Sequence, residues 1–190
     1  MSTIKLGYAL CGSHCTLSHA VNEMQKLTKL GFSITPIMSA AARYTDTRFG
    51  RAEDIARKIE EICGRKIITT VADAEPLGPK EPQDLLIISP CTGNTLAKLA
   101  SGITDTAVTM AAKAHLRQDR PLVIALATND AMSQNLANIS KLLSRKSVYF
   151  LPLKQDDPKG KPHSLVADFE KTQESLFAAM EGKQLRPLFI

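Results

Sequence analysis

Residues 85–100 read LLIISPCTGNTLAKLA, in which a short aliphatic run passes through small polar residues into a segment of helical character. The run 85–89 is apolar nearly throughout, which is typical of a strand covered on both faces of a parallel sheet. The next segment, 95–100, is expected to be a helix. Strand, short polar turn and helix in this order make a βα unit, the building block of α/β folds.

The same unit recurs along the rest of the chain. Short runs of aliphatic or β-branched residues predict strands at 4–10, 33–38, 66–70, 85–89, 122–127 and 147–151. Apolar residues three and four apart predict helices at 17–30, 55–62, 95–100, 105–116, 132–143 and 165–180. Gly31, Gly64 and Gly182 are expected to end three of these helices, and Ser164 to cap the last one. The alternation predicts an α/β fold built on a parallel sheet.

Length and composition are those of a compact globular chain. The 190 residues are 44% hydrophobic and 23% charged, enough to bury a core without disulfides or metals. We therefore expect residues 1–190 to form a single domain. The apolar runs are too short for a membrane span and the first residues lack the pattern of a signal peptide, so a cytoplasmic protein is expected. The four cysteines are too few and too scattered for a disulfide framework and are expected to be reduced.

The charge of the chain bears on its partners. The net charge is +5, which suits an anionic ligand. Nucleic acid is the obvious alternative, but the basic residues are spread along the chain without interleaved aromatic residues. A nucleic-acid partner is therefore not expected.

Small polar residues follow four of the predicted strands. The turns read CGSHC at 11–15, SAA at 39–41, SPCTGNT at 89–95 and TND at 128–130. In an open parallel sheet, ligands bind at the carboxyl ends of the strands, beside helix N-termini that attract anions. Glycine lets the backbone approach a ligand, and hydroxyls beside amide donors suit a phosphate; these residues are Gly12, Ser13, Thr92 and Thr95. The alternative is that each segment is an ordinary turn with a capping Ser or Thr.

Other kinds of site are disfavoured. The chain has neither the G-x-G-x-x-G fingerprint with a following acidic residue nor a Walker loop. Cys11, His14, Cys15 and His19 suggest a metal site, but a strand-to-helix turn would not arrange them as a zinc knuckle, and no metal is expected. Cys91 at a helix N-terminus could be a nucleophile, although a small buried thiol beneath a ligand is the favoured interpretation.

The segment 89–114, SPCTGNTLAKLASGITDTAVTMAAKA, resembles the homo-oligomeric flavin-containing cysteine decarboxylase family, which includes phosphopantothenoylcysteine decarboxylase and the flavin prenyltransferases. The family motif P-A-S-A-N-T-x-A-K-x-A-x-G-x-x-D is matched at Pro90, Asn94, Thr95, Ala97, Lys98, Ala100, Gly102 and Asp105. The resemblance implies a three-layer, flavodoxin-like (Rossmann-like) domain that binds FMN. Carried over position by position, it implies cofactor contacts at Gly12, Ser13, Ser39, Ser89, Thr92, Asn94 and Thr95. The turn after the fifth predicted strand adds Thr128 and Asn129 to this set.

Two departures from the family pattern bear on the reaction. Cys91, Thr92 and Gly93 replace Ala, Ser and Ala, which keeps the turn small and keeps its hydroxyl. Residues 39–64 contain no His, whereas the decarboxylases of the family have a catalytic His there, and 127–132 read ATNDAM where the family has P-x-M-N-x-x-M. Decarboxylation of a cysteine is therefore disfavoured, since a general base is missing.

The segments 120–129 and 146–169 narrow the resemblance to members that act with a separate, nicotinamide-binding dehydrogenase subunit on a small anionic dicarboxylate. The resemblance implies a flavin-type oxidoreductase subunit that also forms a homo-oligomer, and the small residues of 105–114 would allow close packing. Two alternatives remain open: a non-catalytic partner that keeps an inherited flavin pocket, and a flavin-dependent decarboxylase or prenyltransferase. No catalytic residue is assigned.

The polar segment 155–164, QDDPKGKPHS, follows the last predicted strand and is expected to be a loop. Because it starts where the ligand turns collect, we expect it to cover the site or to dock a partner. Lys159, Lys161 and His163 would then offer positive charge to a dicarboxylate, while the two aspartates turn the chain or bind the partner. The alternative is a solvated loop with no role.

Overall fold

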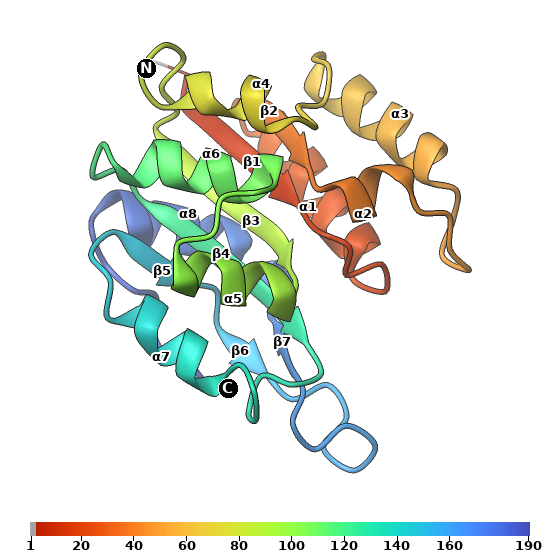
Figure 1. The fold of residues 1–190 in the computed structure, drawn as a ribbon, viewed down its shortest axis with the longest axis vertical. Helices are drawn as coiled ribbons and strands as arrows, with labels where there is room; N and C mark the ends of the chain where they lie inside the picture. The colour runs from red at the N-terminus through yellow and green to blue at the C-terminus, as the bar shows by residue number, and fades with distance from the viewer. Residues whose placement is uncertain (1–2) are drawn as a thin grey trace.

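The computed structural model describes residues 3–190 as a mostly parallel sheet between two layers of helices (Figure 1). The strands are β1 (Lys5–Leu10), β2 (Ser33–Met38), β3 (Leu85–Cys91), β4 (Leu122–Thr128), β5 (Val148–Phe150), β6 (Leu153–Lys154) and β7 (Leu165–Ala167). The α-helices are α1 (Leu17–Lys29), α2 (Ala40–Tyr44), α3 (Ala52–Cys63), α4 (Val71–Ala74), α5 (Gly93–Ser101), α6 (Ala107–Leu116), α7 (Leu136–Leu143) and α8 (Thr172–Met180). Two 3-10 helices are η1 (Glu75–Leu77) and η2 (Phe169–Lys171).

The sheet is doubly wound. Its strand order is β2-β1-β3-β4, and both β5 and β7 pair with the outer edge of β4. β5 runs parallel beside residues 122–124 of β4, and β7 runs antiparallel beside Ala127 and Thr128. β6 pairs antiparallel with β7 and completes a hairpin. The parallel part has the order of flavodoxin-like sheets, which confirms the expected α/β fold class.

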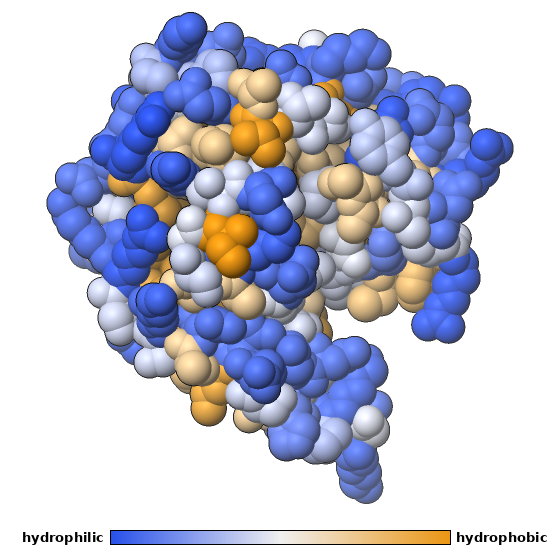
Figure 2. Space-filling view, in the orientation of Figure 1, coloured by the Kyte–Doolittle hydropathy of each residue, from blue (hydrophilic) through white to orange (hydrophobic). Residues whose placement is uncertain are grey.

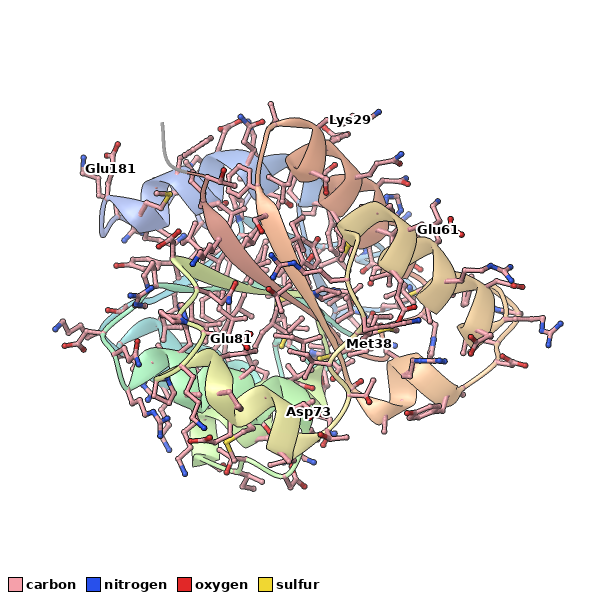
Figure 3. All side chains as sticks on the ribbon, turned by 90° about the horizontal axis from the view of Figure 1, so that it is seen from above. Lys29, Met38, Glu61, Asp73, Glu81 and Glu181 are labelled. Carbon is pink, nitrogen blue, oxygen red and sulfur yellow. The ribbon has the colours of Figure 1, made fainter. Side chains whose placement is uncertain are left out.

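Helices cover both faces of this sheet. α1, α3 and α8 pack on one face, and α5, α6 and α7 on the other, where α4 lies outside against α6. Seen from above, α1 and α8 lie on one side of the strands and α4 on the opposite side (Figure 3). Central strand β3 is buried at every residue because it is covered twice, as its apolar sequence predicts. No helix within residues 3–190 is long and apolar enough to cross a bilayer.

The predicted strand at 66–70 is wrong. Within it, only Ile68 pairs, in an isolated bridge to Ile37 of β2. The Ile68 N–H donates to the Pro36 carbonyl oxygen, and its own carbonyl accepts from Met38, both at 2.9 Å. Thr70 then caps α4, because its side chain accepts from the backbone N–H of Asp73. Only a short connection therefore separates the end of α3 from the start of α4, and its backbone pairs with the sheet at Ile68 alone.

The predicted helix at 165–180 is wrong at its start. Residues 165–167 form β7, with Leu165 and Ala167 buried and Val166 half-buried, the alternation of a strand. Short β5 leaves the end of β4 unpaired, and β7 fills that gap. Ser164 is not a helix cap: it is fully buried, and its hydroxyl donates to Asp156 at 2.7 Å.

The predicted helix at 132–143 also starts later than expected, at Leu136. The Met132 N–H donates to the His163 carbonyl oxygen at 2.9 Å, so this segment is bonded to the β6–β7 hairpin loop. The Asp130 carbonyl oxygen accepts from the N–H groups of Ser133 and Asn135, so residues 130–135 form turns and the helix starts after them.

The small residues of α6 pack against other parts of the same chain. Ala107, Ala111, Ala112 and Ala114 are all buried. A Cβ at Gly78 would overlap the Ala114 carbonyl oxygen, which shows how closely the η1 segment approaches the helix. Packing within the chain therefore accounts for these small residues, and they do not by themselves support an interface between copies.

Candidate functional site

A cavity of about 790 Å³ opens at the carboxyl ends of β1, β3 and β4. Strand-end turns form its floor, with the turn 12–16, Thr92 and residues 127–129. Its walls come from the loop 45–51 between α2 and α3, which contributes Arg48 and Phe49, and from the β6–β7 hairpin with the η2 segment, which contributes Lys154, Asp156, Lys161 and residues 166–170. In the space-filling view a notch separates the projecting 155–164 loop from the body of the molecule (Figure 2).

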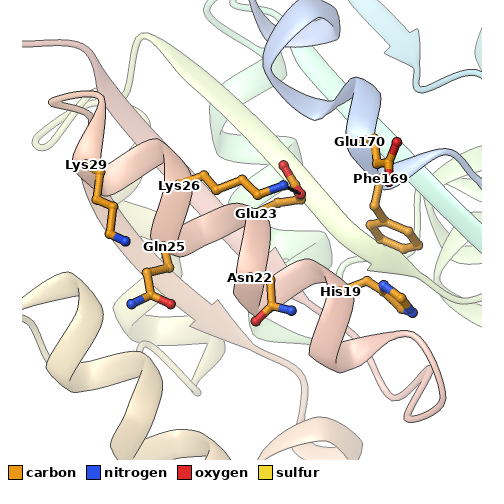
Figure 4. Close-up of a pocket in the computed structure, with 8 residues that line it drawn as sticks. All are labelled: His19, Asn22, Glu23, Gln25, Lys26, Lys29, Phe169 and Glu170. Atoms are coloured by element: carbon orange, nitrogen blue, oxygen red, sulfur yellow. Dashed lines mark hydrogen bonds and ion pairs between the residues drawn. The ribbon is translucent and has the colours of Figure 1, made fainter.

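A second hollow of about 380 Å³ adjoins it along α1 (Figure 4). His19, Phe169 and Glu170 line both spaces. The remaining lining consists of polar side chains of α1, among which Lys26 and Glu23 form an ion pair at 2.6 Å. None of the strand-end turns lines this hollow. The larger cavity is therefore the candidate site.

The turn after β1 is closed by its own hydroxyls. The Thr16 Oγ1 atom donates to the Ser13 side chain at 2.9 Å and lies 3.1 Å from the Ser13 carbonyl oxygen. A Cβ at Gly12 would lie 3.1 Å from the Ala41 Cβ, so a side chain there would crowd the neighbouring turn. The N–H groups of the first turn of α1 have no acceptors within the helix, and the helix dipole adds positive potential at this end. This end of the cavity can bind an anion.

The turn after β3 starts a second helix beside the first. Thr92 caps α5, because its Oγ1 accepts from the Thr95 N–H at 3.2 Å. Thr95 Oγ1 donates to the Cys11 sulfur at 3.2 Å, and the Cys11 N–H donates to the Pro90 carbonyl oxygen at 3.1 Å. The turns after β1 and β3 are thereby bonded to each other. The N-cap residues of both helices, Thr16 of α1 and Thr92 of α5, line the cavity.

The turn after β4 explains the glycine that replaces the alanine of the family motif. The Asp130 carboxylate accepts from Thr128 Oγ1 at 2.5 Å and from Asn135 Nδ2 at 2.9 Å. A Cβ at Gly93 would lie 2.6 Å from both of these donor atoms and 2.8 Å from an Asp130 oxygen. The hydrogen-bonded cluster Thr128–Asp130–Asn135 therefore occupies the space that an alanine methyl would need.

Five of the nine predicted cofactor-binding residues line the cavity: Gly12, Ser13, Thr92, Thr128 and Asn129. They come from three different turns, which the sheet brings to one edge because parallel strands end together. Their contacts with a cofactor stay a prediction, but their convergence is a property of the fold.

The other four predicted residues do not line it. Ser39 caps α2, where its Oγ accepts from the Ala42 N–H at 3.3 Å. The Ser89 hydroxyl is fully buried and hydrogen-bonded to that of Tyr8 at 3.1 Å, so it belongs to the core. Asn94 is exposed on α5, and Thr95 is buried against Cys11.

Sequence reasoning missed Arg48 and Phe49, together with the two strands of the hairpin. β6 and β7 have two and three residues, too few for a periodic pattern. Arg48 and Phe49 stand in a polar segment between two helices, and Arg43 and Tyr44 nearby form the same pair of a cation and an aromatic ring without lining the cavity. No local signal in the sequence therefore distinguishes Arg48 and Phe49.

The lysines of the hairpin are paired with carboxylates. Lys161 Nζ lies 2.9 Å from Asp156, and Lys154 Nζ lies 3.3 Å from Asp168. Burial raises the pKa of Asp156, but hydrogen bonds from Lys161 and Ser164 outweigh it and leave the pKa below its ordinary value. The same hydrogen bond from Lys161 raises the pKa of that lysine. The hairpin therefore presents compensated rather than free charge to the cavity.

The two cysteines at the strand ends are buried thiols. Burial raises the pKa of Cys11 to about 11 and raises that of Cys91 well above its ordinary value. Neither sulfur is a thiolate near neutral pH, which supports the interpretation of Cys91 as a small buried residue rather than a nucleophile. Among residues 3–190 no group of three His, Cys, Asp or Glu side chains is arranged to bind a metal ion.

Known proteins resemble this chain in sequence and fold. A family model described as Flavoprotein matches residues 1–176. The B subunit of dipicolinate synthase from Bacillus subtilis (strain 168) is 39% identical over 193 residues, which cover 100% of this chain and 96% of the relative. The crystal structure of the B subunit of dipicolinate synthase from Bacillus halodurans C superposes with a TM-score of 0.91 at 41% identity, covering 100% of this chain and 98% of that one. The FMN-dependent cysteine decarboxylase SpaF has a TM-score of 0.69 at 25% identity, over 94% of this chain and 97% of its own. This chain belongs to the Flavoprotein family.

Proposed function

We propose that this chain is the FMN-binding B subunit of a dipicolinate synthase and acts with a separate A subunit of that enzyme. The likeness to the B subunit of dipicolinate synthase extends over the whole chain, at 39% identity. The observation that carries the proposal is the cavity at the ends of β1, β3 and β4, where the N-termini of α1 and α5 meet. The reaction would convert dihydrodipicolinate to dipicolinate, in the context of sporulation and in the cytoplasm.

The residues present fit FMN. A phosphate suits the α1 end, where Gly12 leaves the backbone open and the Ser13 hydroxyl lines the cavity. Thr92 supplies a hydroxyl at the start of α5. The volume of about 790 Å³ falls in the range of cofactor pockets, roughly 300 to 1,000 Å³. The dinucleotide fingerprint is absent from the sequence, which favours a mononucleotide.

In the proposed reaction the substrate loses two electrons and two protons and becomes an aromatic pyridine ring. Flavin, when bound, supplies two-electron redox chemistry. The contribution of this chain would be to bind the phosphate at the two helix N-termini, to fix the floor through the cluster Thr128–Asp130–Asn135, and to position an anionic substrate against the remaining walls.

The second candidate function is a non-catalytic partner of the A subunit. It is favoured by the absence of His from residues 39–64, where the decarboxylases of the family carry their catalytic base. In that case the A subunit would perform the redox step, and this chain would provide a binding surface. A flavin-dependent decarboxylase or prenyltransferase is the remaining alternative, and the same missing base argues against the decarboxylase.

The test combines FMN titration with reconstitution. We expect FMN added to the purified chain to bind at one site per chain and its fluorescence to change to a plateau. Ser13→Ala should weaken FMN binding by about 10- to 100-fold, the value of one hydrogen bond to a charged group. Ser140→Ala, an exposed serine of α7, is the matched control. A chain that takes up no FMN contradicts the cofactor assignment.

Turnover then separates the two candidates. Synthase activity that requires both the A subunit and FMN-loaded chain supports the catalytic proposal. Activity that requires the chain but not FMN supports the non-catalytic partner.

We also propose a homo-oligomer, as in the dodecameric FMN-dependent UbiX-like decarboxylase of Escherichia coli O157:H7, which is 25% identical with a TM-score of 0.66 over 78% of this chain. Asn94 is exposed in the single chain, and a neighbouring copy would bring it into a shared site. Light scattering after size exclusion tests the assembly. A monomer that binds FMN would contradict the shared site.

A further inference from the structure

The loop 45–51 forms a closed turn with Arg48 and Phe49 at its tip. Thr47 and Gly50 exchange both backbone hydrogen bonds, at 3.1 and 3.0 Å. The Phe49 N–H donates to Thr47 Oγ1 at 3.2 Å, and Asp46 accepts from the Ala52 N–H at 2.8 Å, which ties the loop to the start of α3. The loop is thus held by its own hydrogen bonds and presents its two central side chains in a defined place.

Those two side chains contribute little to the fold. Phe49 is 51% exposed, which leaves much of a large apolar ring in water. The Arg48 guanidinium lies over this ring, with 4.9 Å from its central carbon to the ring centroid. Arg48 forms no ion pair with any acidic residue within 3–190. Both nevertheless line the cavity.

The charges around the cavity leave Arg48 uncompensated. Of the lysine and arginine side chains that line it, Lys154 and Lys161 pair with Asp168 and Asp156. Glu170 also lines the cavity, at its border with the adjoining hollow, but Lys26 pairs with Glu23 and Lys171 with Glu174, so Glu170 forms no ion pair among residues 3–190. In the part of the chain that the structure describes, Arg48 is the permanent cation of the cavity that still lacks a carboxylate.

We propose that Arg48 and Phe49 form the substrate-binding wall for a planar ring that carries a carboxylate. This inference rests on the proposed function and names the residues that would recognise its substrate. A guanidinium that stacks on an aromatic face keeps its edge free, and that edge binds a carboxylate through two parallel hydrogen bonds. The exposed part of the Phe49 ring offers an apolar surface for the substrate ring. Both features match a pyridine or dihydropyridine dicarboxylate.

The experiment measures dipicolinate binding to the FMN-loaded protein by isothermal titration calorimetry. Arg48→Ala should weaken dipicolinate binding by about 10-fold or more, because it removes a charge-assisted pair. Arg48→Lys should recover part of the loss, since lysine keeps the charge but not the two-pronged geometry. Arg51→Ala is the matched control: it removes an exposed arginine from the same loop that does not line the cavity. FMN affinity should stay within about 2-fold in all three variants.

Binding of picolinate, which has one carboxylate fewer than dipicolinate, tests whether Arg48 contacts the second carboxylate. If Arg48 binds the second carboxylate, Arg48→Ala should weaken picolinate binding much less than dipicolinate binding. Phe49→Ala should weaken both ligands by a similar factor of about 3 to 5, because the ring is common to them. Tyr44→Ala, which removes another exposed aromatic residue that does not line the cavity, should weaken neither.

Three results would overturn the inference. The first is dipicolinate binding by Arg48→Ala equal to that of the wild type, or equal losses in Arg48→Ala and Arg51→Ala. The second is a parallel loss of FMN affinity in Arg48→Ala, which would assign Arg48 to the cofactor. The third is no saturable binding of dipicolinate by the FMN-loaded wild type. FMN uptake and turnover with the A subunit report separately on the proposed function, so the failure of one is distinguishable from the failure of the other.

Discussion

The loops 45–51 and 155–164 both border the cavity, but they use their charged residues in opposite ways. The long loop carries several charges, and the two that reach the cavity, Lys161 and Asp156, are paired with each other. The short loop is closed by backbone hydrogen bonds and leaves Arg48 without a carboxylate among the described residues. The number of charges in a loop is therefore a poor guide to the charge it offers a ligand. What matters is whether those charges are compensated within the fold.

Both loops border the same floor of strand-end turns, and Gly93→Ala should produce the largest effect because it disturbs that floor. The new methyl would lie 2.6 Å from Thr128 Oγ1 and Asn135 Nδ2, so the hydrogen bonds to Asp130 must rearrange. We expect a loss of about 1 to 3 kcal/mol in the free energy of unfolding. Urea unfolding measures it, with Ser101→Ala at the exposed end of α5 as the control. Unchanged stability would mean that the floor is adaptable and that the loops are not held in one arrangement.

Asp156→Ala tests the internal pairing of the long loop. It removes the partner of Lys161 and leaves the fully buried Ser164 hydroxyl without its acceptor. An unpaired buried hydroxyl predicts a loss of about 1 to 2 kcal/mol in the free energy of unfolding, again by urea titration. Arg48→Ala should cost almost nothing in the same assay. If the two variants lost equal stability, the contrast between the loops would be wrong.

The same pairing should depend on pH. Burial raises the pKa of Asp156, but hydrogen bonds from Lys161 and Ser164 hold it below its ordinary value. The carboxylate therefore stays charged to a lower pH in the folded protein than in the unfolded chain. Its contribution is full above the ordinary carboxyl pKa, about 4, and is lost as the pH falls through the lower folded-state value. The stability difference between the wild type and Asp156→Ala should be constant from about pH 5 to 8 and shrink toward about pH 3. A difference that persists unchanged in acid would assign it to packing rather than charge.

The smallest effects are expected for the lysines of the long loop. Lys161→Ala leaves the Asp156 carboxylate unpaired on the cavity wall and should weaken dipicolinate binding by about 2- to 3-fold. Lys159→Ala should leave binding unchanged, because Lys159 does not line the cavity. The double variant should bind FMN normally and behave like Lys161→Ala in synthase assays. If Lys159→Ala weakened dipicolinate binding more than Arg48→Ala does, the long loop and not Arg48 would make the main contact with the anionic ligand.

Much of the fold could be predicted from local pattern. The apolar runs predict strands β1, β2, β3 and β4 within two residues of their ends, because strands covered on both faces are apolar throughout. The prediction is wrong where local sequence competes with distant partners. The apolar residues of 165–167 are spaced three and four positions from those of 168–180, as in a helix. In the structure they pair with the end of β4 that β5 leaves free, and so form β7. The segment 66–70 is strand-like, but the Thr70 cap ends it.

The sequence by itself determined the α/β class, the turns at the strand ends and, through the motif at 89–105, the relationship to the family. These depend on residues close together in the chain: apolar runs, small turn residues and capping hydroxyls. Only the tertiary structure decided which predicted residues converge on the cavity, that Ser89 is sequestered beside Tyr8, and which charges are compensated. Lys154 and Asp168, for example, are 14 positions apart and meet only because β6 and β7 pair. The charge that a cavity offers is a sum over contacts between distant residues, and local sequence patterns do not contain those contacts.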